Sequence, residues 1–200
     1  MKVAIIKYNA GNIASVDNAM KRIGVDAVIT GNPAEIQSAD KVIFPGVGEA
    51  ETTMAYLRQH ELDKVICGLK QPVLGICIGL QLMCKSSTEA DNGKVECLGI
   101  FDETVQKFQP NQHIIKVPHM GWNTIQPVAD CKLFANLPKD PYFYYVHSYY
   151  ASVGQHTIAT TEYINQYSAA LHRDNFYAVQ FHPEKSGALG ETILKNFLEL

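Results

Sequence analysis

The residues best suited to chemistry in this sequence are a cysteine flanked by two glycines. The segment Gly75-Ile76-Cys77-Ile78-Gly79 is the thiol counterpart of the Gly-x-Ser-x-Gly motif, in which a nucleophile lies on a sharp turn between a strand and a helix. The turn is tight, and two glycines avoid the collisions that side chains would cause. The positive end of the helix dipole would favour the thiolate of Cys77. Taken alone, the segment fits a buried structural cysteine between packing glycines equally well.

A histidine and a glutamate lie two residues apart near the end of the sequence, in His182-Pro183-Glu184. In an extended segment this spacing places both side chains on one side of the chain, and Pro183 disfavours a helix there. An imidazole oriented by a carboxylate and brought against a cysteine forms a triad for nucleophilic catalysis. Taken alone, the pair fits a surface turn or half of a metal site. A metal would need further ligands, which are missing, so we expect no metal.

A second glycine-containing loop, Pro45-Gly46-Val47-Gly48, follows an apolar run that ends at Phe44. Parallel α/β sheets carry their sites at the carboxyl ends of the strands, so this loop and Cys77 would be neighbours. The backbone N–H groups of the loop could bind an anion or an oxyanion. Phosphate is the weaker alternative, because neither Gly-Lys-Ser/Thr nor a third glycine at dinucleotide spacing is present. Taken alone, the loop is better interpreted as a plain turn.

Strand-like and helix-like segments alternate in the first half of the chain, where these residues must be positioned. Continuous apolar runs predict buried strands, and apolar residues at helical spacing predict helices. A parallel sheet with right-handed crossovers is expected from this order. The predicted strands are residues 3–8, 25–30, 41–44 and the run before Cys77; residues 9–12 are a predicted turn; the predicted helices are 13–23, 49–59, 62–69 and one through 80–83.

The second half contains short strand candidates separated by turn residues, with few helix signals between them. This pattern is typical of an antiparallel or mixed β section attached to a parallel core. The predicted strands are residues 104–108, 114–117, 142–146, 157–163, 168–172 and 176–181, and the predicted final helix is 189–200. We therefore expect an α/β fold, with a mostly parallel central sheet flanked by helices and an additional antiparallel or mixed β section, in a single domain of residues 1–200.

The composition is that of an ordinary globular protein, with 46% hydrophobic and 18% charged residues among 200. The net charge of −3 gives no basic surface for nucleic acid. Five scattered cysteines without a Cys-x-x-Cys pair argue against a disulfide framework or a zinc site and favour reduced thiols in a cytosol. The first apolar run is too short for a signal peptide, and no run approaches the roughly 20 residues of a membrane span. We expect a cytoplasmic protein that binds neither nucleic acid nor membrane.

The Cys77 motif through Gln81, together with His182-Pro183-Glu184, resembles the triad-type glutamine amidotransferases, which have a flavodoxin-like fold. More closely, the chain resembles the glutaminase subunits of imidazole glycerol phosphate synthase, an enzyme of histidine biosynthesis. This closer resemblance extends over almost the whole chain, through residues 8–13, 44–48, 116–123, 146–149 and 182–186. The segments Pro118–Asn123 and Gly11-Asn12 are its most specific parts.

The resemblance implies hydrolysis of glutamine to glutamate and ammonia through a glutamyl thioester, without a cofactor. Cys77 would be the nucleophile, His182 the proton carrier, and Glu184 the carboxylate that orients the imidazole. The backbone N–H of Ile78, the residue after the nucleophile, would bind the oxyanion. The resemblance adds the N–H of Val47 to the oxyanion hole and implies a substrate-binding set of Gly46, Gln81, Glu89, Ser148 and Tyr149. Without the family, a solvated Glu89 and a core-packed Tyr149 would be the expectation.

The resemblance also implies a partner, a (β/α)8 barrel synthase subunit that forms a heterodimer with this chain. Ammonia would pass into the barrel, which makes imidazole glycerol phosphate and an aminoimidazole carboxamide ribotide. Trp122, the single tryptophan, suits an interface anchor, although a core position is equally compatible with the sequence. The implied docking face consists of Asn12, His119, Met120, Trp122, Tyr144 and Lys185.

Two alternatives remain open at this level. The first is a glutaminase for another acceptor, such as one in pyridoxal phosphate synthesis, although residues 118–123 argue against it. The second is a non-catalytic protein on the same scaffold, with Cys77 as a redox sensor. The intact set of Cys77, His182 and Glu184 disfavours the second alternative.

Overall fold

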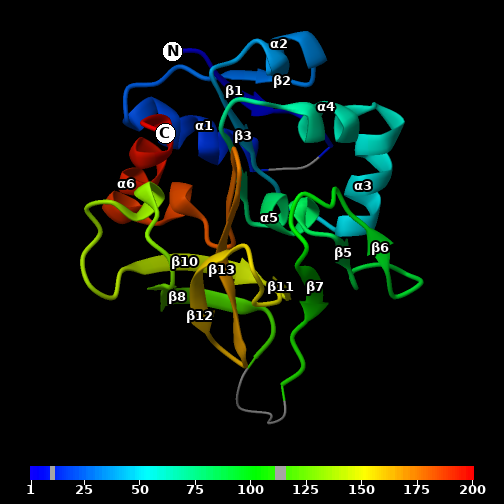
Figure 1. Cartoon of the computed structure of the whole chain (residues 1–200), viewed down its shortest axis with the longest axis vertical. Coiled ribbons are helices and arrows are strands. Elements are labelled where there is room, and N and C mark those ends of the chain that lie inside the picture. The colour runs from blue at the N-terminus through cyan, green and yellow to red at the C-terminus, as the bar shows by residue number, and fades with distance from the viewer. Residues whose placement is uncertain (10–11, 111–115) are drawn as a thin grey trace.

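An eight-stranded mixed sheet forms the centre of the computed structural model, which describes residues 1–9, 12–110 and 116–200 (Figure 1). The strand order is β2-β1-β3-β4-β14-β13-β12-β9. Pairing is parallel from β2 to β14 and antiparallel from β14 to β9. The strands are β1 (Val3–Ile6), β2 (Val28–Thr30), β3 (Lys41–Phe44), β4 (Val73–Ile76), β9 (Gln126–Pro127), β12 (Thr157–Glu162), β13 (Gln166–Arg173) and β14 (Phe176–Val179).

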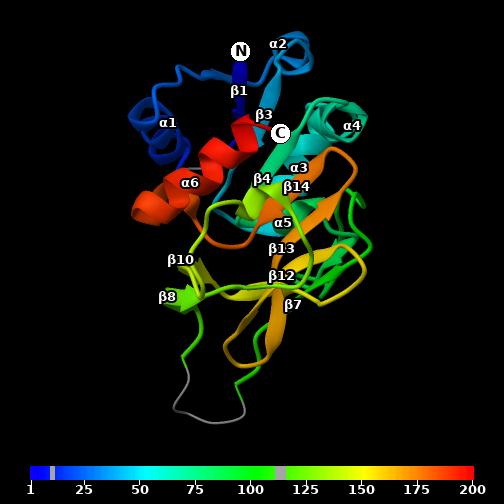
Figure 2. The same ribbon diagram turned by 60° about the vertical axis from the view of Figure 1, so that its left-hand side comes forward.

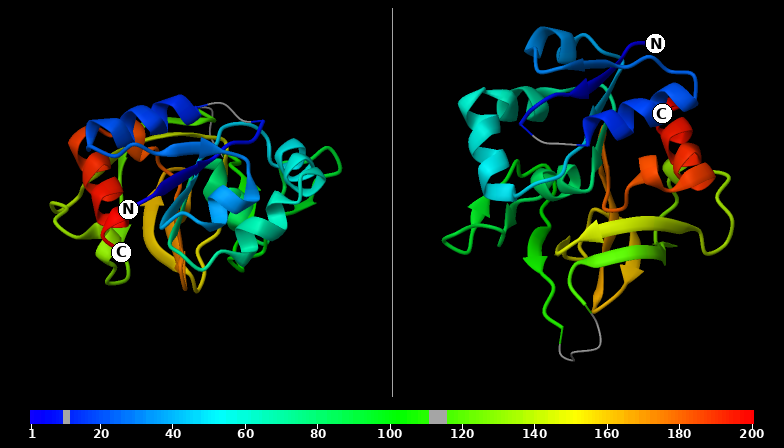
Figure 3. Two further views of the ribbon diagram at one scale, coloured as in Figure 1. Left: turned by 90° about the horizontal axis from the view of Figure 1, so that it is seen from above. Right: turned by 180° about the vertical axis from the view of Figure 1, so that it is seen from behind.

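Helices cover both faces of the parallel strands, and every residue of β1, β3 and β4 is buried, as their continuous apolar sequences predict. One face packs against α2 (Pro33–Gln37), α3 (Ala50–Gln59), α4 (Leu62–Gly68) and α5 (Ile78–Met83). The other packs against α1 (Ile13–Arg22) and α6 (Gly187–Leu198). Figure 3 shows α1 and α6 on one side of the sheet and α3 and α4 on the other.

Two smaller sheets complete the second half. A two-stranded antiparallel ribbon consists of β8 (His119–Thr124) and β10 (Tyr142–His147), and Figure 2 shows it below α6, beside β12 and β13. The other sheet has the order β11-β7-β5-β6, with β11 (Tyr149–Ala151), β7 (Thr104–Lys107), β5 (Ser86–Ser87) and β6 (Val95–Glu96). Short 3-10 turns are formed by η1 (Lys132–Phe134) and η2 (Pro183–Lys185). None of the helices in the described ranges has the length and apolar character to cross a membrane.

The predicted mostly parallel sheet with an antiparallel second section is confirmed, and the deviations are local. The second strand begins at Val28, and the last helix begins at Gly187. The prediction missed α2, although Pro33 opens the helix and the Asn32 side chain accepts a hydrogen bond from Ala34 N–H at 2.9 Å. It also missed β8 and the short strands β5, β6, β9 and β11. Residues 114–115 of one predicted strand and 10–11 of the predicted turn lie outside the described residues.

Candidate active site

The predicted site residues gather at the carboxyl ends of parallel strands. The loop at residues 45–48 follows β3, Cys77 follows β4, and His182 lies three residues beyond the end of β14. Strand β4 pairs with both β3 and β14, and Ile76 lies opposite Val179. Parallel strands end on the same edge of a sheet, so three segments far apart in the sequence become neighbours.

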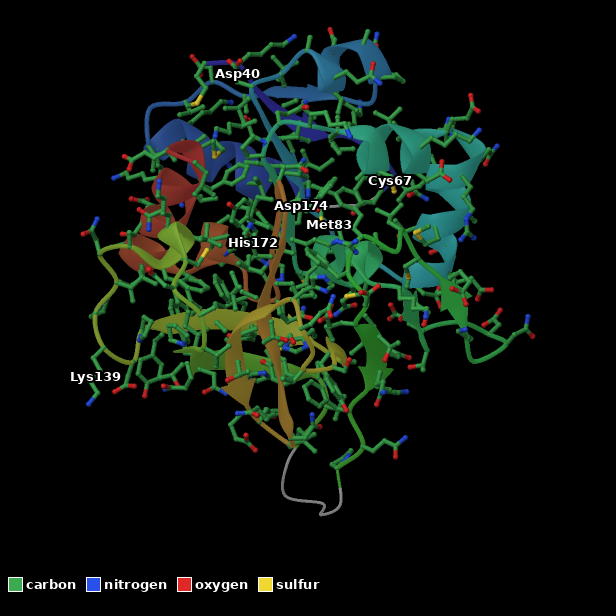
Figure 4. The ribbon with its side chains drawn as sticks, viewed as in Figure 1. Asp40, Cys67, Met83, Lys139, His172 and Asp174 are labelled. Carbon is green, nitrogen blue, oxygen red and sulfur yellow. The ribbon has the colours of Figure 1, made fainter. Side chains whose placement is uncertain are left out.

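Cys77 lies on a strained turn between β4 and α5. Its backbone φ of 55° and ψ of −108° fall where residues other than glycine are uncommon. A Cβ at Gly79 would overlap the carbonyl oxygen of Phe44, and one at Gly75 would lie 2.9 Å from the sulfur of Met83, which Figure 4 labels. The glycines of the motif are therefore required by the close approach of β3 and α5 to the turn.

The sulfur of Cys77, at the edge of the apolar core, has two polar neighbours. The side chain is 6% exposed and borders a cavity. The sulfur accepts a hydrogen bond from Gln180 Nε2 at 3.7 Å and lies 4.0 Å from the carbonyl oxygen of Val146. Sequence reasoning missed Gln180, although its position two residues before His182 was a usable signal.

His182 and Glu184 form a buried pair. The imidazole Nδ1 lies 2.7 Å from Glu184 Oε1, and both side chains are almost fully buried. A carboxylate can only accept, so the hydrogen of the imidazole lies on Nδ1 and Nε2 faces away from Glu184. Among the residues that the structure describes, His182 Nε2 and Glu184 Oε2 have no hydrogen-bond partner. Nε2 is therefore available for proton exchange.

The electrostatics of this pair favour an imidazolium. Burial lowers the pKa of His182, but the neighbouring Cys77 sulfur and the hydrogen bond to Glu184 outweigh burial and raise that pKa to about 10. The charged ring is thus stable at neutral pH when a thiolate lies beside it. Such an ion pair supplies a nucleophile and a proton donor together.

The local geometry of the His182–Glu184 pair differs from the expected extended segment. Pro183, Glu184 and Lys185 form the 3-10 turn η2, and His182 is its extended N-cap residue. Proline suits the first position of a helical turn, because its φ is already helical and its missing N–H would have no partner there. The two side chains meet across this turn and not through the two-residue period of a strand.

The loop at residues 45–48 lies directly against the start of α5. Gly46 is buried, Val47 is half-buried, and Gly48 has a left-handed φ of 132°. A Cβ at Gly46 would overlap the side chain of Ile78. Ile78 is the first residue of α5, and the first N–H groups of a helix have no acceptor within it. Val47 and Ile78 both border the same cavity as Cys77.

This cavity has a volume of about 310 Å³. Its lining consists of Val47, Gly48, Cys77, Ile78, Gln81, Glu89, Pro118, Val146, His147, Ser148 and Tyr149. The predicted substrate-binding residues are thus brought together, except that Gly46, like His182 and Glu184, is not part of the lining. Within the described ranges, no three His, Cys, Asp or Glu side chains are grouped so as to hold a metal ion.

The side chains of Gln81 and Glu89, in the cavity lining, already have hydrogen-bond partners. Gln81 Nε2 donates to the carbonyl oxygen of Tyr149 at 2.8 Å and to Gln180 Oε1 at 3.0 Å. Glu89 Oε2 accepts from the N–H of Ala50, the first residue of α3, at 2.9 Å. Burial raises the pKa of Glu89 above its usual value, although the Ala50 hydrogen bond opposes the rise. A cationic amino group of a substrate would give this carboxylate a partner of opposite charge.

The β8–β10 ribbon carries the exposed part of the predicted docking face. Met120 and Trp122 are 63% and 56% exposed. Tyr144 lies opposite Trp122 in the register, with the ring centroids 6.0 Å apart. Lys185 Nζ lies 5.9 Å from the centre of the Tyr144 ring. These four side chains form one continuous surface beside the His182 turn.

The other two residues of the predicted docking face, His119 and Asn12, are less exposed. Successive residues of a strand face opposite sides, so His119 points inward while Met120 points outward. The His119 ring is 3% exposed and stacks on Tyr145 and Tyr163 at centroid distances of 4.8 and 3.9 Å. Asn12 is half-buried, and its Nδ2 donates to Glu184 Oε1 at 2.8 Å. Of the six residues of the predicted docking face, four are on this surface, His119 is buried and Asn12 is half-buried, and their docking role stays a prediction.

The ribbon is hydrogen-bonded to the histidine segment. His182 N–H donates to the carbonyl oxygen of Tyr144 at 2.9 Å, and Tyr144 N–H donates to Ser186 Oγ at 2.9 Å. Ser186 Oγ in turn donates to the carbonyl oxygen of His182 at 2.6 Å. A displacement of β10 would therefore move His182.

Comparisons with known proteins agree with this fold. Residues 4–200 match the family model described as "Glutamine amidotransferase class-I". The fold is similar to a crystal structure of a glutamine amidotransferase from Thermotoga maritima, with a TM-score of 0.65, 17% identity, and coverage of 100% of this chain and 81% of the other. The arrangement is that of a class-I glutamine amidotransferase.

Proteins of higher sequence identity identify one family within this class. The chain is 61% identical over 200 residues to imidazole glycerol phosphate synthase subunit HisH of Bacteroides fragilis strain YCH46, with 100% of both chains covered. It is 45% identical over 203 residues to the subunit HisH of Photorhabdus laumondii, again with complete coverage of both. The chain therefore belongs to the class-I glutamine amidotransferases and, within them, to the family of imidazole glycerol phosphate synthase subunits HisH.

Proposed function

We propose that this chain is the glutaminase subunit of an imidazole glycerol phosphate synthase and hydrolyses glutamine with Cys77, His182 and Glu184. The observation that carries the proposal is the His182–Glu184 hydrogen bond of 2.7 Å, next to the strained Cys77 turn. Within the described ranges, the other imidazole nitrogen, His182 Nε2, has no hydrogen-bond partner. The raised pKa of His182 supports an imidazolium next to a thiolate. Together these features supply a nucleophile, a proton carrier and an orienting carboxylate.

The reaction would proceed by acyl transfer. The thiol proton passes to His182 Nε2, and the thiolate attacks the side-chain amide carbon of glutamine. The tetrahedral intermediate collapses when Nε2 returns the proton to the leaving nitrogen, which departs as ammonia and leaves a glutamyl thioester on Cys77. Water, deprotonated by the same nitrogen, attacks the thioester and releases glutamate. Glu184 holds the ring in position and stabilises its positive charge throughout.

Backbone N–H groups of Ile78 and Val47 would bind the oxyanion. The first is the leading amide of α5, and the second belongs to the loop that packs against Ile78. One such donor lowers the activation barrier by about 2.7–4 kcal/mol. A loop that holds Val47 N–H away from the oxyanion would therefore leave the enzyme slow.

Gln81, Glu89, Ser148 and Tyr149 would bind the amino-acid end of glutamine. All four border the cavity that contains the Cys77 sulfur. Glu89 is suited to the amino group, because it is a half-buried carboxylate whose pKa burial raises and whose protein partner is a neutral N–H. The main chain around Gly46 would close the other side of the bound substrate.

Ammonia would pass to a (β/α)8 barrel synthase subunit bound to the surface of Met120, Trp122, Tyr144 and Lys185. Exposed aromatic residues beside a cation are typical anchors of interfaces. The relatives are named as subunits of a synthase, which supports the presence of a partner subunit. Docking there would bear on the reaction, because Tyr144 is hydrogen-bonded to the His182 segment.

The test is acceptor-dependent glutamine hydrolysis. Glutamate release is measured for the chain alone, with a barrel synthase subunit of histidine biosynthesis, and with a synthase of another pathway. We expect activity with the first synthase and none for Cys77→Ser, whereas Cys67→Ser, which changes an exposed free thiol on α4, retains it. Activation by a different synthase alone would assign the chain to another acceptor, and glutamine hydrolysis by Cys77→Ser would refute the mechanism.

We further propose that residues 1–200 act as one glutamine amidotransferase domain in the cytoplasm. The central sheet takes strands from both halves of the chain, which supports one folding unit. All five cysteines are free, as suits a reducing compartment. Limited proteolysis followed by denaturant unfolding would test the single unit, since two domains would give two transitions.

A further inference from the structure

A buried phenol contacts the proposed oxyanion loop. Tyr8, just after β1, is 5% exposed, and its hydroxyl donates to the carbonyl oxygen of Pro45 at 2.6 Å. Its ring packs on Phe44, the last residue of β3, with the centroids 5.6 Å apart. The hydroxyl thus binds the first residue of the loop, while the ring fixes the phenol on the end of the strand that leads into it.

Gly46 lies between this phenol and the start of α5. A Cβ at Gly46 would overlap both the hydroxyl oxygen of Tyr8 and the Cγ2 atom of Ile78. The loop is therefore enclosed at Gly46 by two side chains, one of which belongs to the other proposed oxyanion residue. The tyrosine hydroxyl occupies space that only glycine leaves free.

Toward the carbonyl oxygen of Pro45, the phenol is the hydrogen-bond donor. Burial raises the pKa of Tyr8 well above its usual value, and negative charge on Cys77 raises it further. The hydroxyl therefore keeps its proton at any working pH. Its acceptor is a backbone carbonyl oxygen, so the direction of the hydrogen bond is fixed.

We propose that Tyr8 is a positioning residue that fixes the Pro45–Gly46 peptide and thereby aims the Val47 N–H at the oxyanion. A peptide unit is planar, so a bond to the Pro45 carbonyl holds the whole Pro45–Gly46 unit. The next unit, which carries the Val47 N–H, then turns only about the backbone of Gly46, where glycine allows wide rotation. Tyr8 makes Gly46 the pivot of the loop. This inference rests on the proposed glutaminase function.

The oxyanion exists only in the transition state and the tetrahedral intermediate, so the loss of this anchor should reduce kcat and spare KM. Tyr8→Phe keeps the ring on Phe44 and removes only the hydroxyl. In the complex with the barrel subunit, we expect Tyr8→Phe to lower kcat for glutamine hydrolysis about tenfold, with KM changed less than about twofold. Amide hydrogen exchange of residues 46–50 should become several-fold faster in the same variant.

Tyr145→Phe is the matched control. Like Tyr8, Tyr145 is buried, and its side chain is on the inward side of β10. Its hydroxyl lies 2.8 Å from Thr161 Oγ1. This variant also loses one buried hydroxyl hydrogen bond, but it should leave kcat and exchange at residues 46–50 unchanged. Equal effects of the two variants on kcat and exchange would overturn the role of Tyr8, and so would a Tyr8→Phe enzyme with wild-type kcat.

Hydrogen exchange separates this inference from the proposed function. If the wild-type complex released no glutamate, the glutaminase assignment would fail, and exchange would still measure how Tyr8 holds the loop. Faster exchange at residues 46–50 in Tyr8→Phe alone would support the anchor. Unchanged exchange would overturn it, whatever the activity.

Discussion

Asn12 Nδ2 donates a hydrogen bond of 2.8 Å to Glu184 Oε1, the same oxygen that lies 2.7 Å from His182 Nδ1. One carboxylate oxygen therefore carries two donors, while the other has no hydrogen-bond partner within the described ranges. Asn12 precedes α1 in a left-handed conformation with φ 71° and makes no capping bond with its side chain. The amide is thus directed at the carboxylate and not at the helix.

Asn12→Gly should slow the enzyme with little loss of stability. Glycine tolerates the left-handed backbone, so the substitution mainly removes the amide donor. A hydrogen bond to a charged group contributes about 1.5–3 kcal/mol, and a tenfold loss corresponds to about 1.4 kcal/mol. We expect kcat for glutamine hydrolysis in the complex to fall about tenfold, since only part of that energy belongs to the transition state.

Asn136→Gly provides the control for Asn12→Gly. Asn136 is exposed and also has a left-handed φ, of 62°. The chemical change and the backbone conformation match, and only the contact with Glu184 differs. Equal kcat values for the two variants would show that the Asn12 amide is not needed for turnover.

Glu184→Gln should lower turnover more than stability. The amide keeps the shape of the side chain and can still accept from His182 Nδ1, but it no longer stabilises the imidazolium by charge. We expect at least a hundredfold loss in kcat, equivalent to about 2.7 kcal/mol, and a smaller loss in the free energy of unfolding in urea.

A second buried His–Glu pair in the same chain gives the comparison. Glu103 Oε2 lies 3.0 Å from His156 Nδ1, and both side chains are almost fully buried. Neither residue borders the Cys77 cavity. Glu103→Gln should therefore lower stability and spare kcat. Parallel losses of kcat and stability in Glu184→Gln would make Glu184 a structural residue as well.

The parallel half of the fold was predictable because its signals are local. Strands β1 and β3 are short apolar runs buried on both faces, and α1 buries Val16, Ala19 and Met20 at helical spacing. Strand β8 gave no such signal, since Met120 and Trp122 face solvent and Gly121 interrupts it. Its strand conformation comes from pairing with β10, some 20 residues away in the sequence.

The candidate site was predictable where one motif carried the chemistry. The Cys77 turn and the His182–Glu184 pair are contiguous motifs, and family resemblance supplied Gln81, Glu89 and Tyr149. The contacts of Tyr8 and Asn12 were not predictable, because their partners are far away in the sequence. Tyr8 contacts a residue 37 positions away, and Asn12 contacts one 172 positions away. No periodicity encodes such contacts, which follow only from the order of the strands in the sheet.

Two buried histidines form a directional hydrogen-bond chain through Tyr167. His147 Nδ1 lies 2.7 Å from the carbonyl oxygen of Tyr149, so Nδ1 carries a hydrogen. In a neutral ring Nε2 is then an acceptor, and it lies 3.3 Å from the Tyr167 hydroxyl, which donates to it. The hydroxyl has then donated its one proton, and His119 Nδ1, at 3.2 Å, must donate to its oxygen. This arrangement is that of two neutral rings, which burial favours, each with its hydrogen on Nδ1.

Stability should fall when the pH is lowered from about 6.5 towards 4. Burial lowers the pKa of His119 to about 4 and, as its largest effect, that of His147 to about 3. The unfolded chain takes up these protons near pH 6.5 and the folded chain does not, so acid favours unfolding. Each ring should contribute a slope of up to about 1.4 kcal/mol per pH unit in this range.

Denaturant unfolding between pH 4 and 8 tests this pH dependence. His119→Gln should be less stable at pH 8, because it loses stacking, yet its stability should depend less on pH than that of the wild type. His60→Gln, at an exposed ring after α3, controls for the loss of a histidine. A slope for His119→Gln equal to that of the wild type would mean that His119 titrates normally in the fold.

Trp122→Ala should weaken partner binding without weakening the fold. The indole is more than half exposed, so its removal leaves no cavity in the free subunit, whereas a buried interface tryptophan contributes about 2 kcal/mol or more. We expect the dissociation constant for the barrel subunit to rise at least about thirtyfold, by calorimetry or surface plasmon resonance, with an unchanged melting temperature.

The control for Trp122→Ala is Val128→Ala, which also removes an exposed apolar side chain, 59% exposed, just after β9. If apolar surface alone drove association, both truncations would weaken binding in proportion to the area removed. If the ribbon is the docking site, only Trp122→Ala will do so, and saturating partner will restore its glutamine hydrolysis, because the His182 segment is hydrogen-bonded to β10 through its backbone. Wild-type affinity in Trp122→Ala would move the docking site away from the β8–β10 ribbon.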